Sequence, residues 1–188
     1  MQTPTTQHRV VGVLLAAGQG SRYGMPKVLA DRGAWLESAV AALWGGGCSR
    51  VIVVLGAADT AVPDGAEAVY APDWREGVGA SLRAGLAAAS GDPDADYAAV
   101  HLVDLPDVHA DAVARVIAAA AATESGLARA FYGADPGHPV VMARGHWAAV
   151  SRTATGDLGA LPYLREHAGL VRRVDCDDLA TGADRDTR

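Results

Sequence analysis

The chain alternates short apolar runs with longer segments of helical character, and this alternation constrains the fold more than any other feature. Residues 51–55 read Val-Ile-Val-Val-Leu, which is typical of a strand covered on both faces. We predict strands at Val10–Leu15, Arg50–Leu55, Glu67–Tyr70, Tyr97–Val103, Leu127–Tyr132, Pro139–Met142 and Leu170–Val174. We predict helices at Trp35–Trp44, Gly79–Ala89, Ala110–Thr123, Ala143–Val150 and Leu158–His167. Such alternation predicts an α/β fold with a doubly wound, mostly parallel sheet and helices on both faces.

The length of 188 residues, without an internal repeat or a linker, favours one domain over residues 1–188. Residues 1–8 and 181–188 lack periodic apolar positions, and we expect them to be mobile. A net charge of −6 disfavours general nucleic-acid binding. Neither a signal peptide nor an apolar run of membrane-spanning length is evident, so we expect a cytoplasmic protein without membrane contact. Cys48 and Cys176 have no metal-ligand spacing and fit free thiols in a reducing compartment.

A glycine-rich loop follows the first predicted strand. It contains Gly18, Gly20 and Gly24, with the cations Arg22 and Lys27 between and after them. Glycine lets backbone N–H groups crowd against an anion, and the two cations can neutralise a polyphosphate. The spacing is one residue too long for the dinucleotide fingerprint, and no Gly-Lys-Ser or Gly-Lys-Thr follows for a P-loop. We favour a polyphosphate-binding loop over the plainer alternative, a tight turn with surface cations.

Two further candidates also follow predicted strands, where parallel sheets bind ligands. Asp104 directly follows the predicted strand 97–103 and is suited to Mg²⁺, which prefers one or two carboxylates plus substrate phosphates. The alternative for Asp104, or for Asp107, is a helix N-cap. Ser81 lies in the first turn of the helix after Gly77, where free N–H groups can receive an anion. An ordinary capped amphipathic helix is the alternative there.

Taken together, these motifs resemble the MobA-like NTP transferase family, and within it the molybdenum cofactor cytidylyltransferases. The resemblance spans nearly the whole chain. The chain departs from the family pattern at Ala71 and Val103, which replace asparagine and glycine, and Pro-Glu-Asp does not follow Thr187. The stretches that carry the resemblance are residues 14–27, Leu102-Val103-Asp104-Leu105-Pro106, residues 71–85, Gly137-His138-Pro139-Val140-Val141, Gly156-Asp157-Leu158-Gly159 and Ala183-Asp184-Arg185-Asp186-Thr187.

The resemblance implies a Rossmann-like fold of the nucleotide-diphospho-sugar transferase type, and roles for particular residues. It implies catalytic roles for Arg22, Lys27 and Asp104, with Asp104 and Asp184 as metal ligands. It implies contact of His138 and Asp157 with the acceptor. The alternative for His138 is a structural histidine, and the alternative for Asp157 is a helix N-cap. For Asp184 the alternative is a disordered tail. The residues implied to bind the nucleotide are Ala16, Ala17, Gly18, Gly20, Arg22, Lys27 and Ser81.

The function that this resemblance implies is nucleotidyl transfer. A terminal phosphate of molybdopterin or its molybdenum form attacks the α-phosphorus of CTP, and pyrophosphate leaves. Ala16-Ala17-Gly18 is more similar to the CTP-using group than to its GTP-using relatives. The expected cofactor is Mg²⁺, with Mn²⁺ as the alternative, and a molybdenum hydroxylase is a candidate partner.

Other functions stay open at this point. Transfer of GMP, or transfer to a sugar phosphate, uses the same site chemistry. The departures at Ala71 and Val103, with the shortened tail motif, keep open a non-catalytic nucleotide-binding protein that delivers a cofactor. A dinucleotide-binding dehydrogenase domain is disfavoured by the glycine spacing.

Overall fold

A seven-stranded sheet runs through the molecule in the order β3-β2-β1-β4-β6-β5-β7. The computed structural model describes residues 8–185, so residues 1–7 and 186–188 of the ends predicted to be mobile lie outside the described residues. Neighbouring strands are parallel except where β6 is involved, which is antiparallel to β4 and β5. The strands are β1 (Val10–Leu15), β2 (Arg50–Leu55), β3 (Glu67–Tyr70), β4 (Tyr97–Leu102), β5 (Leu127–Tyr132), β6 (Asp135–Ala143) and β7 (Arg172–Asp175).

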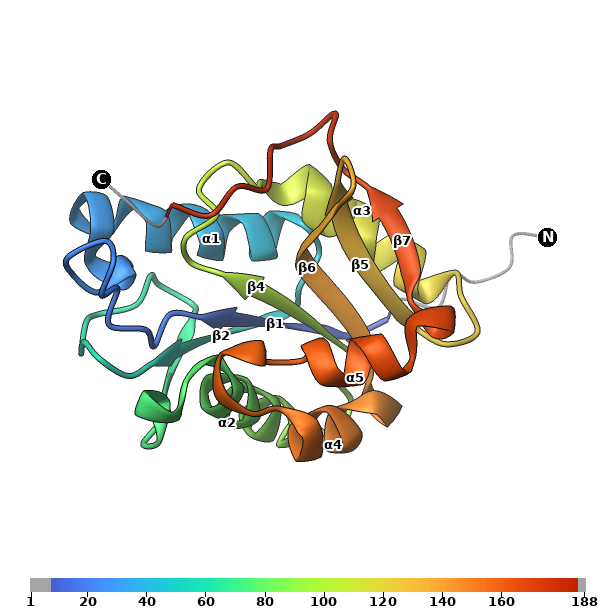
Figure 1. Cartoon of the computed structure of the whole chain (residues 1–188), viewed down its shortest axis with the longest axis horizontal. Helices are drawn as coiled ribbons and strands as arrows, with labels where there is room; N and C mark the ends of the chain where they lie inside the picture. Colours follow the sequence, from blue (N-terminus) through green and yellow to red (C-terminus); the bar gives the residue numbers. More distant parts are fainter. Residues whose placement is uncertain (1–7, 186–188) are drawn as a thin grey trace.

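Helices cover both faces of the sheet, which confirms the predicted doubly wound α/β architecture (Figure 1). One face carries α1 (Ala34–Gly45) and α3 (Ala110–Ala121). The other face carries α2 (Val78–Ser90), α4 (Arg144–Thr153) and α5 (Leu161–Glu166). No helix within residues 8–185 is both long enough and apolar enough to cross a bilayer. Short 3₁₀ helices complete the connections: η1 (Lys27–Gly33), η2 (Trp74–Glu76), η3 (Gly156–Leu158) and η4 (Ala168–Leu170).

The hairpin between β5 and β6 explains the antiparallel strand. The hairpin is closed by the pair Tyr132 and Asp135 around Gly133, which has φ 61°. Because pairing with β5 continues up to the turn, β6 begins at Asp135 and not at the predicted Pro139. The reversal of direction at this turn makes β6 antiparallel to its neighbours.

Most other boundaries differ from the prediction by one to three residues, and two of the differences follow from 3₁₀ turns. The helix predicted for residues 158–167 begins at Leu161, because Gly159 has φ 52° and ends η3 before it. The strand predicted from Leu170 begins at Arg172, because residues 168–170 form η4. Glycines end α1 at Gly45, one residue beyond the predicted Trp44, and Gly47 has φ 105°.

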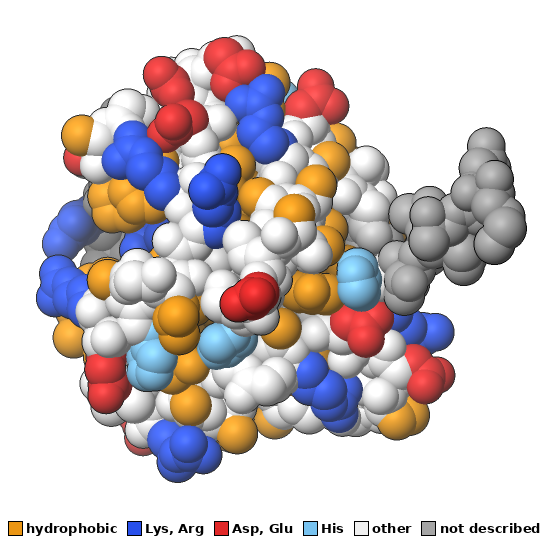
Figure 2. Space-filling view, turned by 90° about the vertical axis from the view of Figure 1, so that its right-hand side faces the viewer, with side chains coloured by type: hydrophobic (Ala, Val, Ile, Leu, Met, Phe, Trp, Pro, Cys, Tyr) orange, Lys and Arg blue, Asp and Glu red, His pale blue; other side chains and the backbone are white. Residues whose placement is uncertain are grey.

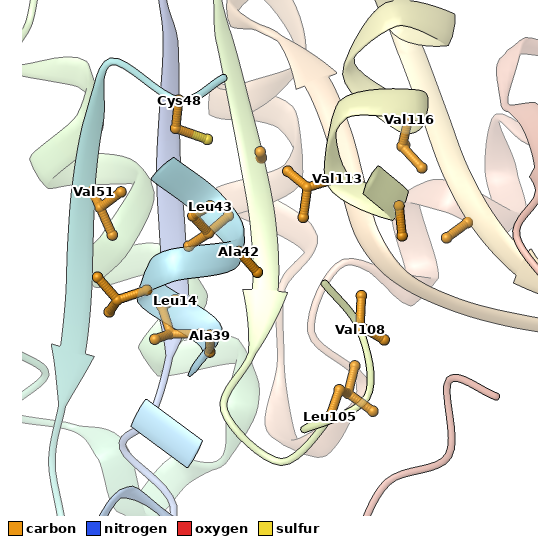
Figure 3. Packing of buried hydrophobic residues seen from close by; sticks show 14 of the residues in the cluster. Leu14, Ala39, Ala42, Leu43, Cys48, Val51, Leu105, Val108, Val113 and Val116 are labelled. Atoms are coloured by element: carbon orange, nitrogen blue, oxygen red, sulfur yellow. The ribbon is translucent and has the colours of Figure 1, made fainter. Parts of the chain in front are cut away.

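The core lies on both faces of the central strands. Residues 51–55 of β2 are all buried, as predicted for a strand covered on both faces, and so is every residue of β1. On the α1 and α3 face, Leu14, Leu43 and Val113 pack together (Figure 3), and burying each such side chain contributes about 1.5–3 kcal/mol. Cys48 is free and packs there too; burial raises the pKa of its thiol to about 12, so it stays protonated and behaves as an apolar group.

The strand order places a topological switch point between β1 and β4. The chain goes from β1 to β2 and β3 on one side, and returns to β4 on the other side of β1. The loops after these two parallel strands therefore diverge and leave a crevice at their carboxyl ends, where open α/β sheets bind ligands. On the face of the molecule shown in Figure 2, acidic and basic side chains are interspersed over the surface.

Candidate active site

A pocket of about 290 Å³ lies at the carboxyl ends of β1 and β4. The polar and charged side chains of its lining come from three elements: the loop after β1, the first turns of α2 and the loop after β4. The structure thus brings together, in one pocket, all the residues predicted to bind the nucleotide and Asp104, one of the two acids predicted to hold the metal; Asp184, the other, does not line this pocket. The residues brought together are Ala16, Ala17, Gly18, Gly20, Arg22, Lys27, Ser81 and Asp104.

The glycines of the first loop have two different tasks. Gly20 has φ 61°, and a Cβ there would collide with the carbonyl oxygen of Met25. Its own carbonyl accepts a hydrogen bond from the Gly24 amide at 2.8 Å, so it sets the shape of the loop. A Cβ on Gly18 would meet no atom within 4 Å. Gly18 also lines the pocket, so its backbone is open to the close approach of a ligand.

Lys27 and Asp104 join the two loops that line the pocket. The Lys27 Nζ donates to Asp104 Oδ2 at 2.6 Å, although the residues are 77 positions apart. Both side chains are largely buried, with exposed fractions of 12% and 18%. Charge-assisted hydrogen bonds of this length are among the stronger polar contacts in proteins. The pair therefore places one positive and one negative charge side by side in the lining of the first pocket.

The start of α2 packs closely against residues 154–157. Gly77 has φ 108°, and a Cβ there would lie 2.5 Å from Asp157 Oδ1; a Cβ on Gly79 would lie 2.8 Å from the Thr155 amide nitrogen. These glycines thus let α2 and η3 approach each other. Ser81, one turn on, is buried and lines the pocket. That free N–H groups of this turn receive an anion stays a prediction.

A second pocket of about 200 Å³ adjoins the first, and the two share Leu15, Val78 and Leu102. His138 and Asp157, the predicted acceptor ligands, both line it. Burial, and then the positive charge of Arg129, lowers the pKa of His138 to about 3, so its ring is neutral at neutral pH. Asp157 does not cap α5, whose N-cap residue is Ala160.

Arg129 lines the second pocket as well, and the sequence analysis missed it. The signal that could have found it is a single cation in an otherwise apolar strand, Leu-Ala-Arg-Ala-Phe-Tyr. An arginine in such a strand needs either a partner or a ligand, because burial of an unpaired charge is costly.

The C-terminal segment after β7 crosses back over the α1 side of the sheet (Figure 1). Thr181 donates to Asp107 Oδ2 from its amide at 2.8 Å and from its hydroxyl at 2.5 Å, and the Arg185 amide donates to the Asp104 carbonyl at 3.1 Å. These bonds bring Asp184 to the neighbourhood of Asp104. Asp107 therefore holds the tail and is not the N-cap of α3, which is His109. Asp186 and Thr187 of the tail motif lie outside the described residues.

The donor set near the first pocket suits a hard divalent cation. Asp104 lines the pocket and offers carboxylate oxygens, the ligands that Mg²⁺ and Mn²⁺ prefer. Asp184 does not line the pocket, and its role as a metal ligand stays a prediction. Among residues 8–185 no group of three or more histidine, cysteine or acidic side chains is placed to hold a metal. One or two carboxylates completed by substrate phosphates and water is a usual arrangement for Mg²⁺, and the residues present fit it.

Comparison with known proteins identifies relatives of this chain by sequence. Residues 12–171 match the family model described as a MobA-like NTP transferase domain. The nicotine blue oxidoreductase of Paenarthrobacter nicotinovorans is 39% identical over 192 residues, covering 95% of this chain and 92% of that protein.

Solved structures extend the comparison. Rv0371c from Mycobacterium tuberculosis H37Rv superposes with a TM-score of 0.80 at 29% identity, covering 97% of this chain and 95% of that one. A complex of Rv0371c with manganese superposes with a TM-score of 0.71 at 26% identity, covering 89% of this chain and 88% of that one. The fold shared with Rv0371c covers nearly the whole chain, including β1 and β4, at whose carboxyl ends the first pocket lies.

Proposed function

Because the chain belongs to the MobA-like NTP transferase family, we propose that it transfers CMP from CTP to the phosphate of a molybdopterin-type acceptor. The observation that carries the proposal is the first pocket, where the glycine loop, Arg22 and Lys27 lie beside Asp104. Backbone donors and cations on one side and a carboxylate on the other are what a metal-bound triphosphate needs.

The chemistry is a substitution at phosphorus. An oxygen of the acceptor phosphate attacks the α-phosphorus of CTP, the bond from that phosphorus to the bridging oxygen breaks, and pyrophosphate leaves with the electron pair. Arg22 and Lys27 neutralise the charge that builds up on the leaving pyrophosphate. The acceptor phosphate is already ionised at neutral pH, so no general base is required. The protein contributes positioning and charge stabilisation.

Asp104 and Asp184 are the residues that would hold a divalent cation, which would neutralise phosphate charge when bound. Mg²⁺ is the proposed ion and Mn²⁺ the alternative, and the manganese complex of Rv0371c supports a divalent site in this family. In this proposal Lys27 has a second task, since its bond to Asp104 Oδ2 orients that carboxylate before the nucleotide arrives.

The nucleotide and acceptor preferences belong to the same proposal. The start of the loop, Ala16-Ala17-Gly18, favours CTP over GTP, as in the CTP-using group it resembles. His138 and Asp157 would contact the acceptor from the second pocket. A cytoplasmic location and a molybdenum hydroxylase as the enzyme that receives the product complete the proposal.

The test is pyrophosphate release with each of the four NTPs, in the presence of molybdopterin, a sugar phosphate or no acceptor. The proposal expects release with CTP and molybdopterin, dependent on Mg²⁺ or Mn²⁺. Pyrophosphate release with GTP or with the sugar phosphate would show that the reaction type is right and the proposed substrates are wrong. Tight CTP binding with no release under any condition would favour the cofactor-delivery alternative.

A second candidate function rests on the relative named nicotine blue oxidoreductase, because 39% identity spans 95% of this chain. In that case the first pocket would bind the pyrophosphate of a nicotinamide dinucleotide, and the second pocket the electron acceptor. The glycine spacing, which is not that of the dinucleotide fingerprint, speaks against it. Oxidation of NADH or NADPH by nicotine blue in the presence of this protein, followed by absorbance, distinguishes the two reactions.

A further inference from the structure

The guanidinium of Arg129 is held in place without an acidic partner. Its Nε donates to the Gly137 carbonyl at 3.0 Å and its Nη2 to the Pro136 carbonyl at 3.2 Å. Two of the five N–H donors of a guanidinium are used in this way. Within residues 8–185 no acidic side chain forms an ion pair with Arg129, and burial lowers its pKa. The positive charge is thus partly desolvated and open to an anion.

The surroundings of Arg129 are mainly apolar. The second pocket lies between the sheet and α5, with Val140, Met142 and Leu164 among its walls. Its volume of about 200 Å³ is below the range of roughly 300–1,000 Å³ for whole-ligand pockets, so it holds part of a ligand. Leu158, on the same lining, is 53% exposed and extends the apolar surface outwards.

The two other polar side chains of this lining do not neutralise Arg129. Asp157 is exposed and forms no ion pair with it in the described part of the chain. The His138 ring makes no hydrogen bond to another described residue and is neutral at neutral pH, so one nitrogen can donate and the other accept. The lining can therefore form hydrogen bonds with a ligand, and among its residues in the described part of the chain only Arg129 carries a positive charge.

We propose that the second pocket binds an apolar ring system of the second substrate, and that Arg129 binds an anionic oxygen group carried by that ring. The pocket shares Leu15, Val78 and Leu102 with the nucleotide pocket, so a ligand there lies beside the nucleotide. Only the designation of this ligand as the acceptor rests on the proposed function. Arg129 is in this view a specificity-determining residue: it selects an anionic ring over a neutral ring of the same shape.

The experiment uses two probes of nearly identical shape, naphthalene-2-sulfonate and the neutral naphthalene-2-sulfonamide. Their affinities for the whole chain are measured by calorimetry with CTP present at saturation, so that the nucleotide pocket is filled. Charge-assisted hydrogen bonds predict a preference for the sulfonate of roughly tenfold or more. Arg129→Met should remove that preference, and Arg129→Lys should keep part of it.

Arg165→Met is the matched control, because Arg165 is an exposed arginine on α5 that does not line the pocket. It should keep the wild-type preference. Each variant is compared with the parent by thermal unfolding, and Arg129→Lys answers the question if Arg129→Met does not fold. Equal affinity of the parent for the two probes, or an unchanged preference in Arg129→Met, would overturn the proposal. Loss of bound sulfonate as the CTP concentration is raised would also overturn the proposal.

The binding measurement involves no turnover, so it separates this inference from the proposed reaction. If CTP and molybdopterin yield no pyrophosphate but the sulfonate preference depends on Arg129, the pocket assignment stands and the proposed function fails. If transfer occurs, Arg129→Met should raise the KM for the acceptor and leave the KM for CTP near its parent value. A rise in the KM for CTP of equal size would contradict a role on the acceptor side.

Discussion

At the scale of residues, Lys27 and Asp104 form the contact on which the proposed chemistry depends. The pair joins the loop after β1 to the loop after β4 and is largely shielded from water. We expect Asp104→Asn or Lys27→Met to lower kcat/KM by about 10²–10³, by analogy with the loss of one charge-stabilising group elsewhere. Pyrophosphate release measures this, and Asp111→Asn, an exposed acid on α3, serves as the control. Near-normal, metal-dependent turnover of Asp104→Asn would refute the assignment.

Gly18 and Gly20 of the first loop allow a second prediction at this scale. Gly20→Ala should distort the loop and lower the melting temperature, because its φ is positive and its Cβ would collide with the Met25 carbonyl. Gly18→Ala should leave the melting temperature unchanged, since its Cβ meets open space, but weaken CTP binding by filling the ligand side of the backbone. Thermal unfolding and CTP titration of both variants check this. Equal CTP affinity of Gly18→Ala and the parent would argue against close ligand approach there.

At the scale of elements, the C-terminal segment matters because it carries Asp184 towards Asp104. Gly182 has φ 64°, and a Cβ there would collide with the Tyr132 ring. Gly182→Ala should therefore displace the segment and weaken Mn²⁺ binding about as much as Asp184→Asn, without removing a carboxylate. Electron paramagnetic resonance titration with Mn²⁺ and CTP measures the affinity.

Gly169→Ala is the matched control for the tail, because a Cβ there meets no atom within 4 Å and its φ is ordinary. It should bind Mn²⁺ like the parent. If Gly182→Ala and Asp184→Asn both retain full affinity, Asp184 is not a metal ligand, and Asp104 with the nucleotide phosphates would be the remaining donor set.

At the scale of the whole molecule, His101 couples stability to pH. Its ring is completely buried on β4, neither nitrogen has a partner among the described residues, and burial lowers its pKa from 6.5 to about 4. Between these values the unfolded chain binds a proton that the folded protein does not. The folded state should therefore lose stability as pH falls from 6.5 towards 4, by roughly 3 kcal/mol for this group, and show no such loss at higher pH.

Urea unfolding at several pH values tests this expectation. His101→Leu should reduce the acid-side slope, because the unfolded chain then has one fewer group to protonate. Part of the slope should remain, since His138, with a pKa near 3, acts in the same direction. Identical slopes for the parent and His101→Leu would show that this histidine does not titrate as the buried geometry implies.

Local sequence patterns determined the elements and the identity of the first loop. Almost entirely apolar runs place β1 and β2 at their predicted bounds, because a strand covered on both faces tolerates few polar positions. Gly18, Gly20, Arg22 and Lys27 lie within ten residues of one another, so their chemistry can be interpreted without knowledge of the fold. Boundaries near Gly159 and Leu170 were less accurate, because 3₁₀ turns compete there with helix and strand.

Only the tertiary structure decided which distant residues meet. The contact of Lys27 with Asp104 across 77 positions depends on β4 returning to pair with β1, and the antiparallel β6 depends on a hairpin that carries His138 to the second pocket. The role proposed for Arg129 depends on the apolar walls of the second pocket and on the lack of an acidic ion-pair partner within residues 8–185. Pairing between strands is set by the free energy of the assembled core, to which every element contributes, whereas a turn or a loop is specified by its own few residues.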